Sequence, residues 1–135
     1  MKTLILIIFV LFLVTFLSAC GHRTVDVSFQ PYVADFNADA VRLGHSKKAD
    51  SLSIVFGKMD VAETCGQCHD GMITINKDCW DVQTDTERKI TLYHEFGHCV
   101  LGKSHVETED IMYPTRMNAV VFEGNADHYL ERFFE

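Results

Sequence analysis

The sequence predicts a small α+β domain that contains a short mixed sheet. Two observations favour this class: two short segments alternate apolar and polar residues as strands do, and longer segments place apolar residues at helical spacing. The chain of 135 residues contains two prolines and neither a repeat nor a low-complexity tract. We therefore expect one compact domain.

Residues 1–19 are expected to form a lipoprotein signal peptide and not a part of the fold. Lys2 supplies a positive charge, and residues 4–17 form an apolar run that is short for a membrane span. The sequence LSAC at residues 17–20 resembles a bacterial lipobox, which implies cleavage before Cys20 and acylation of this cysteine. The resemblance implies an exported, membrane-anchored bacterial lipoprotein, and Gly21 favours the outer membrane where the cell has one.

After the signal peptide, residues 20–31 are expected to be the lipidated N-terminus and a tether, and residues 32–135 the folded domain. The chain carries 12 basic and 19 acidic residues, which gives a net charge of −7. This charge argues against a nucleic-acid partner and against a polybasic surface for membranes.

The first half of the domain is expected to contain one helix and two strands. Five apolar residues at near-helical spacing predict the helix, namely Tyr32, Val33, Phe36, Ala40 and Leu43. Gly44 is expected to end it. Alternating apolar residues predict strands at 51–57 and 71–76. Residues 61–70 have no clear period, so we expect a loop there.

The second half is expected to contain two helices. Thr84 and Glu87 form a capping box, which predicts a helix from Thr84 to Gly102. Asn125 is expected to cap a last helix. This helix carries an apolar patch, expected to belong to the core, formed by Leu130, Phe133 and Phe134.

The segment HEFGHCVLGKSH, residues 94–105, predicts a zinc site. Residues four apart share one face of a helix, so His94 and His98 present their imidazoles to the same point. Gly102 allows the chain to reverse, and His105 can then return as the third ligand that a catalytic zinc site requires. Glu95 lies next to His94 around the helix, where its carboxylate reaches the metal-bound water as a general base.

The pattern HEFGH, followed by a glycine, a third histidine and DIMYP at residues 110–114, resembles the metzincin clan of zinc endopeptidases. The Met-Tyr-Pro sequence is most similar to that of matrixins. The resemblance implies one catalytic Zn²⁺, with Met112 in a turn beneath it and with Tyr113 and Pro114 lining the substrate pocket. It also implies that His94, His98 and His105 are the zinc ligands and that Glu95 is the base.

The spacing departs from the usual pattern of this clan, which is HExxHxxGxxH. Here Gly102 and His105 each come one residue later. The helix is therefore expected to be one residue longer or to have a reshaped end. The alternative third ligands are Glu107, Glu109 and Asp110. Gly97 lies inside the predicted helix, where glycine costs about 1 kcal/mol relative to alanine, so we expect another segment to approach it closely.

The function that these residues predict is that of a zinc-dependent endopeptidase acting on a peptide or protein substrate. Glu95 would take a proton from the zinc-bound water and return it to the departing amine. An inactive zinc-binding module is one alternative. Another is an electron-transfer lipoprotein with c-type haem, because CGQCH at residues 65–69 matches the attachment pattern, with His69 as axial ligand.

Four further cysteines lie in a short exported chain, where disulfides form readily, and these are Cys65, Cys68, Cys79 and Cys99. If the strand at 71–76 and the following helix run antiparallel, the loop before the strand lies near the end of the helix. We therefore favour a bridge from Cys65 or Cys68 to Cys99, with Cys79 left without a partner. A structural zinc held by Cys65, Cys68, His69 and Cys79 is the alternative.

Overall fold

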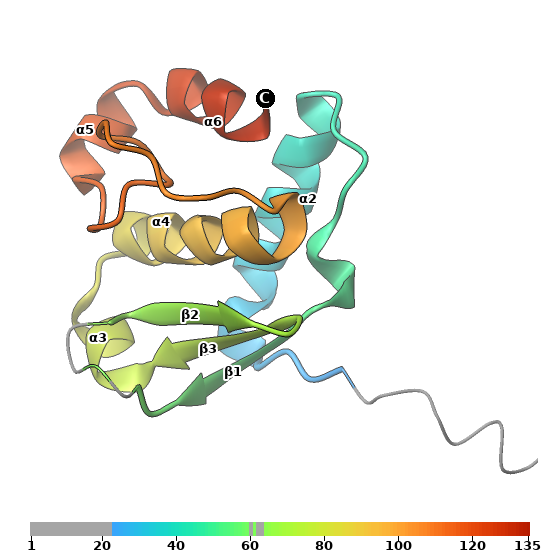
Figure 1. The fold of residues 1–135 in the computed structure, drawn as a ribbon, viewed down its shortest axis with the longest axis vertical. Coiled ribbons are helices and arrows are strands. Elements are labelled where there is room, and N and C mark those ends of the chain that lie inside the picture. The colour runs from blue at the N-terminus through green and yellow to red at the C-terminus, as the bar shows by residue number, and fades with distance from the viewer. Residues whose placement is uncertain (1–22, 60, 62–63) are drawn as a thin grey trace, which may run out of the picture.

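The computed structural model describes residues 23–59, 61 and 64–135, which form five α-helices and a three-stranded mixed sheet (Figure 1). The predicted α+β class is therefore confirmed. The predicted signal peptide and Cys20 lie outside the described residues. Within the described ranges, no helix is both long and apolar enough to cross a membrane.

The folded part begins before the predicted boundary at residue 32. Val25 forms a parallel bridge with Ile54, and the backbone N–H of Asp26 donates to the carbonyl of Ile54 over 3.0 Å. The short helix η1 (Val27–Phe29) follows, and Phe29 has no exposed surface. Residues 25–31, expected to be a tether, thus belong to the domain, because burying Phe29 requires the backbone around it to be ordered.

The first predicted helix is confirmed as α2 (Gln30–Arg42). It buries Tyr32, Phe36 and Ala40, which are four residues apart and so share one face. Gly44 follows the helix with a φ of 77°, a left-handed conformation that glycine adopts without strain.

The sheet has the strand order β1-β3-β2. The predicted strands are confirmed as β1 (Ser53–Gly57) and β3 (Met72–Asn76), which run parallel with Ile54 opposite Ile73. The edge strand β2 (Gly66–His69) pairs antiparallel with β3. The prediction of a loop at 61–70 is therefore wrong for residues 66–69.

A tight turn explains why β2 forms without an apolar period of its own. Asp70 and Gly71 join β2 to β3, and both have positive φ, at 48° and 76°. Two central residues with positive φ form the turn that suits a β-hairpin, and Asp-Gly is a preferred sequence for it. The dipeptide was thus the signal in the sequence that could have predicted this strand.

Two short helices were not predicted, α3 (Lys77–Val82) and α5 (Ala119–Gly124). Each has an asparagine at its N-cap. Asn76 Oδ1 accepts from the backbone N–H of Asp78 over 3.0 Å, and Asn118 Oδ1 accepts from that of Val120 over 2.9 Å. Helices of six residues are too short for a helical period to repeat, which explains why the sequence pattern missed them.

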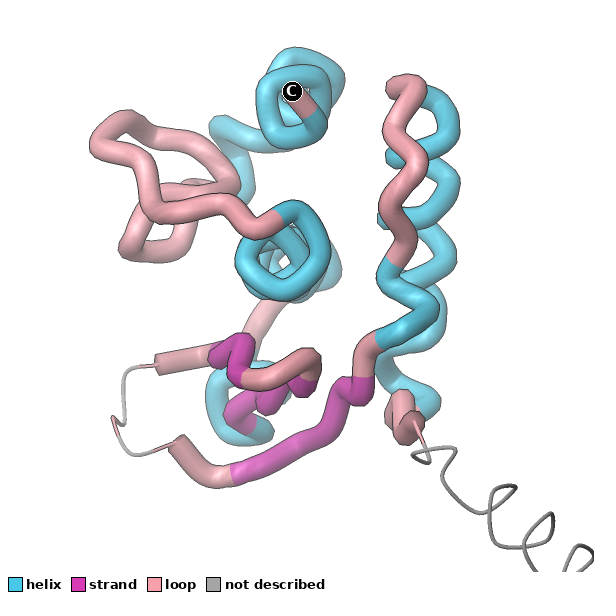
Figure 2. The backbone as a smooth tube through the Cα atoms, turned by 45° about the vertical axis from the view of Figure 1, so that its right-hand side comes forward, coloured by secondary structure: helices cyan, strands magenta, loops and turns pink. Residues whose placement is uncertain are grey.

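The helix α4 (Asp85–Phe96) begins with the predicted capping box. The Thr84 N–H donates to Glu87 Oε2 over 2.8 Å, and the Glu87 N–H donates to Thr84 Oγ1 over 3.3 Å. The helix continues as a π-helical turn, η3 (Gly97–Leu101), and ends at Gly102. It lies between the sheet on one side and the C-terminal helices on the other (Figures 1 and 2).

The last helix, α6 (Ala126–Phe134), contributes its predicted apolar patch to the core. Phe36 of α2 lies at the centre of this core, with ring centroids 4.8 Å from Phe96 and 5.2 Å from Phe134. The side chain of Asn125 makes no capping hydrogen bond, so the predicted cap is not formed. Aromatic packing thus joins α2, α4 and α6.

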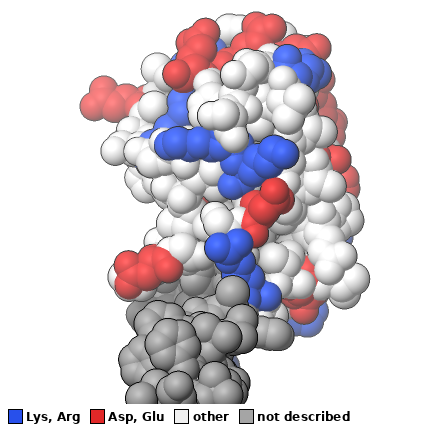
Figure 3. All heavy atoms as spheres, turned by 90° about the vertical axis from the view of Figure 1, so that its right-hand side faces the viewer, with Lys and Arg blue, Asp and Glu red and all other residues white. Residues whose placement is uncertain are grey.

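Charged side chains of both signs lie side by side on the surface, as the face in Figure 3 illustrates. Asp39 of α2 accepts a hydrogen bond from the Tyr93 hydroxyl over 2.8 Å. It also lies 3.1 Å from Arg42 and 3.6 Å from Lys89. The contacts with Tyr93 and Lys89 connect α2 to α4 at the border of the core.

Candidate metal centre

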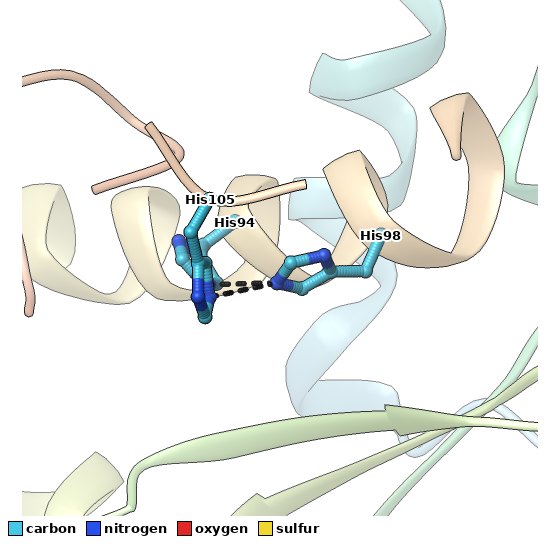
Figure 4. Close-up of side chains that lie close together, drawn as sticks. All are labelled: His94, His98 and His105. Carbon is cyan, nitrogen blue, oxygen red and sulfur yellow. Dashed lines mark hydrogen bonds between the residues drawn. The ribbon is translucent and has the colours of Figure 1, made fainter. Parts of the chain in front are cut away.

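Three imidazoles converge on one point beside α4 (Figure 4). His94 and His98 lie one turn apart on α4 and η3, and His105 comes from the loop that follows Gly102. The three Nε2 atoms lie 3.1 Å from one another in every pairing. In the part of the chain that the structure describes, this is the group of side chains that could hold a metal ion.

The outer nitrogens of two imidazoles are held by backbone carbonyls. His94 Nδ1 lies 2.7 Å from the carbonyl oxygen of Ile111, and His98 Nδ1 lies 2.8 Å from that of Lys103. A carbonyl can only accept, so each Nδ1 carries the proton and each Nε2 presents a lone pair. Two fixed lone pairs therefore point at the same site.

The donor set suits a small cation. Nitrogen ligands of a tetrahedral zinc ion lie about 3.3 Å apart, close to the spacing of the three imidazoles. Burial, helped by the neighbouring His98 and His105 and opposed by the hydrogen bond to Ile111, lowers the pKa of His94 to about 4. His94 is therefore neutral at pH 7, as a metal ligand must be.

The π-helical turn accommodates the extra residue before Gly102. The backbone N–H of Gly102 donates to the carbonyl of Gly97, five residues earlier, and the N–H of Lys103 donates to the same carbonyl over 2.9 Å. A π-turn contains one residue more than an α-turn and commonly occurs at functional sites. The end of the helix is thus reshaped, and His105 reaches the other two histidines.

The alternative third ligands lie elsewhere. Asp110 is buried and pairs with Arg132 over 3.0 Å. Glu107 and Glu109 are exposed, and Glu109 Oε1 accepts from the backbone N–H of Asn118 over 3.4 Å. His105 is therefore the residue that completes the cluster.

Met112 lies in a buried turn that supports the cluster. A Cβ on Gly97 would overlap Met112 Sδ, so the predicted close approach at Gly97 is confirmed. The carbonyl of Met112 accepts from the N–H of Val106, next to His105, over 3.1 Å. Because the preceding Ile111 carbonyl holds His94, this turn positions both the helix histidine and the loop histidine.

Glu95 is 5% exposed and lies against the edge strand β2. Burial raises its pKa to about 7, although a hydrogen bond from the backbone of Cys68 opposes this rise. A Cβ on Gly66 would lie 2.9 Å from Glu95 Cγ and Oε1. Gly66 therefore gives room for Glu95, a role that no pattern in the sequence indicated.

An open cleft of about 780 Å³ contains the cluster and Glu95. It runs over α4, between β2 on one side and residues 111–116 on the other. Tyr113 and Pro114, the residues expected in a substrate pocket, both line it, together with Arg116. The space beside the histidines is therefore large enough for a segment of peptide.

The four cysteines form two pairs at disulfide distance. Cys68 pairs with Cys99, with Cα atoms 5.7 Å apart, and Cys65 pairs with Cys79, with Cα atoms 5.5 Å apart. The favoured bridge to Cys99 is confirmed, and it joins β2 to η3 at the residue that follows His98. Cys79, left without a partner by the sequence, pairs with Cys65.

These pairs leave no support for the alternatives based on CGQCH. Attachment of haem and coordination of zinc both require free thiols, whereas both cysteines of the motif have cysteine partners. The His69 side chain is 77% exposed and points to Asp70, 3.1 Å away. It therefore lies on the surface and not in an apolar pocket.

Known proteins offer no guide to this site. No family model matches the sequence, and neither a curated protein nor a solved structure matches it. A functional conclusion therefore depends on the geometry of the histidines, Glu95 and the cleft.

Proposed function

We propose that the chain is a zinc-dependent endopeptidase of metzincin-like design. The observation that carries this proposal is the position of Glu95, a buried carboxylate with a pKa of about 7 beside three converging imidazoles in an open cleft. A structural metal site is closed by four protein ligands, whereas three ligands leave a position for a reactant. Carboxylates whose pKa is raised by burial cluster at catalytic sites, which supports a chemical role for this one.

Zinc is the metal that this donor set fits best. Three neutral imidazoles suit zinc, and the cluster includes none of the carboxylates that calcium, magnesium or manganese prefer. When bound, zinc supplies Lewis acidity, which polarises a carbonyl and makes water nucleophilic at neutral pH. His94, His98 and His105 would hold it.

Glu95 would act as the general base and then as the general acid. Its carboxylate would take the proton of the attacking water and hand it to the departing amine. A base works best when its pKa is near the working pH, and burial brings Glu95 to about 7. The hydrogen bond from Cys68 and the close contact with Gly66 keep the carboxylate in place.

The edge of β2 supports a peptide as the substrate. The Cys65 carbonyl accepts from the Asn76 N–H over 2.9 Å, so its backbone faces β3. Backbone direction alternates along a strand, and the groups of Gly66 and Cys68 therefore face the open edge, which lines the cleft. The Cys68 N–H already donates to Glu95, so the groups left for a peptide are the N–H and carbonyl of Gly66 and the carbonyl of Cys68. An extended peptide can bind to such an edge through main-chain hydrogen bonds.

We also propose that the protein is exported and held at a membrane by a lipid on Cys20. The two cysteine pairs support export, because disulfides persist in oxidising compartments and are rare in the cytosol. The substrate would then be a peptide or protein of the cell envelope or its surroundings.

The test compares the wild type with Glu95→Gln for bound metal and for hydrolysis of a peptide library. We expect one zinc ion per chain in both proteins and hydrolysis by the wild type alone. Glu131→Gln, an exposed glutamate on α6, is the matched control and should keep full activity. A wild type that binds zinc but cuts no peptide would mean an inactive zinc-binding module, and a wild type without zinc would refute the site.

A further inference from the structure

Arg116 is a charged residue in the cleft with no role in the reaction described above. Among the described residues that line the cleft, Glu95 supplies the one carboxylate and Arg116 the one Lys or Arg cation. The Arg116 side chain is 41% exposed, and its NH2 group lies 3.1 Å from Glu87 Oε1. A cation thus lies at the wall of the cleft in a chain whose net charge is −7.

The contact with Glu87 gives the approximate separation of Arg116 from the histidine cluster along α4. Glu87, Thr91 and His94 are spaced so that they share one face of α4. With 1.5 Å of rise per residue, Glu87 and His94 are about 10 Å apart along the helix. The guanidinium therefore lies about three extended residues of peptide from the metal site.

Hydroxyl groups contribute to the lining of the cleft that contains Arg116. Thr115 precedes Arg116 in the chain, and both Thr115 and Thr64 line this cleft. Thr91 also lines it, but its Oγ1 already accepts from Gln83 Nε2 over 3.0 Å. The hydroxyls of Thr64 and Thr115 can hydrogen-bond to a polar group of a ligand, so this lining is compatible with one.

Arg116 has donors to spare for a ligand. A guanidinium has five N–H donors, and the ion pair with Glu87 uses one of its terminal nitrogens. The Glu87 carboxylate is itself shared, because Oε2 accepts from the Thr84 N–H over 2.8 Å. The fork of a guanidinium matches a carboxylate in a bidentate manner.

We propose that Arg116 determines specificity by binding a carboxylate of the substrate within about three residues of the cut bond. This inference rests on the proposed peptidase function and adds a substrate class to it. The carboxylate belongs either to an aspartate or glutamate side chain or to the C-terminus of a short peptide. In both cases Arg116 binds the substrate and takes no part in the proton transfers.

The test uses the zinc-loaded full-length protein and peptides that differ at one position. Once a library has located the cut bond, Glu and Gln are compared at each of the three positions on either side, in peptides with amidated ends. A third set has Gln at these positions and a free C-terminal carboxylate. At the position that faces Arg116, we expect kcat/KM to be roughly tenfold to hundredfold higher with a carboxylate.

Two variants separate recognition from a structural role. Arg116→Gln should bring the ratio of kcat/KM for the Glu and Gln peptides close to one. Glu87→Gln keeps the guanidinium and the helix cap, since glutamine also serves in a capping box. It removes the competing carboxylate, so the ratio should stay or rise. The inference would be overturned if both variants lowered the Glu-to-Gln ratio of kcat/KM equally. It would also be overturned if the wild type cut the Glu and Gln peptides with equal kcat/KM.

A binding measurement makes the test independent of turnover. Kd values are measured by fluorescence anisotropy on zinc-loaded Glu95→Gln, with and without Arg116→Gln. The peptides carry Glu or Gln at each position in turn, so the series needs no knowledge of the cut bond. We expect the same tenfold to hundredfold ratio, lost in the double variant. If no peptide is cut but this ratio is found, the peptidase proposal fails and carboxylate binding by Arg116 stands. Equal Kd values would refute the role of Arg116 even in an active enzyme.

Discussion

Gly97 and Met112 pack so closely that no side chain fits on Gly97. A Cβ at this position would overlap Met112 Sδ and would lie 3.0 Å from Phe133 Cε2. The contact lies where α4 passes into its π-helical turn, one residue before His98. It therefore packs the turn containing Met112 against the part of the helix that carries His94 and His98.

Gly97→Ala should destabilise the protein by about 1–3 kcal/mol, because overpacking of a core outweighs the gain of up to about 1 kcal/mol in helix propensity. Urea denaturation measures the difference. Gly124→Ala is the matched control, since a Cβ there meets nothing within 4 Å, and it should be neutral or stabilising. If Met112→Ala does not relieve the cost in the double variant, the contact is not its cause.

His105→Ala should lower zinc affinity at least about a hundredfold, because the remaining two histidines leave the ion under-coordinated. Competition with a chromophoric chelator gives the affinity. The double variant Glu107→Ala/Glu109→Ala removes the two exposed alternative ligands and should bind zinc as the wild type does. Zinc binding that depends on these glutamates would contradict the cluster.

Gly66→Ala should reduce kcat/KM roughly tenfold to hundredfold while zinc stays bound, because the new methyl group would displace Glu95. Steady-state kinetics on one peptide, with metal analysis of the same sample, separates these effects. A loss of zinc in parallel with activity would mean that the substitution disturbs α4 as a whole.

In the metal-free protein, Glu95 and His94 should have opposite effects on the pH dependence of stability. The folded pKa of Glu95, about 7, lies above its ordinary 4.5, so its contribution to stability is lost as the pH rises between these values. The folded pKa of His94, about 4, lies below its ordinary 6.5, so its contribution grows as the pH rises. The two trends largely cancel.

Glu95→Gln removes one of these trends. Relative to the wild type, the metal-free variant should gain stability as the pH rises from 4.5 to 7. The gain should be on the order of 3 kcal/mol. Urea denaturation in the presence of EDTA at several pH values measures it. A difference between the two proteins that does not change with pH would show that burial of this carboxyl does not determine its titration.

Replacing Cys68 and Cys99 together by alanine should cost roughly 3–4 kcal/mol, because the closed loop spans 31 residues. The variant should also lose activity, since this pair holds the strand whose backbone contacts Glu95. The double alanine variant of Cys65 and Cys79, which opens a loop of 14 residues, provides the comparison. Equal effects on activity would argue against a special role of the first pair.

Much of the local structure could be predicted because its causes are local. The spacing of Tyr32, Phe36 and Ala40 specified α2, and the capping box of Thr84 specified the start of α4. The helical spacing of His94 and His98 likewise placed two imidazoles on one face. Each of these features depends on residues within one or two turns of each other.

The edge strand β2 forms a local hairpin with β3, and the Asp70-Gly71 turn marks it in the sequence even though no apolar period does. The partner of Cys79 and the role of Gly66 required the tertiary structure, because each depends on a contact between separate segments that no local period records.

The sequence by itself determined the α+β class, the main helices and the set of residues that could bind a metal. Only the tertiary structure decided that His105 completes this set despite its later position. The physical reason is the π-helical turn: whether a helix takes up an extra residue in this way depends on what packs against its end. Here the turn containing Met112 fits against Gly97 and its neighbouring carbonyl holds His94.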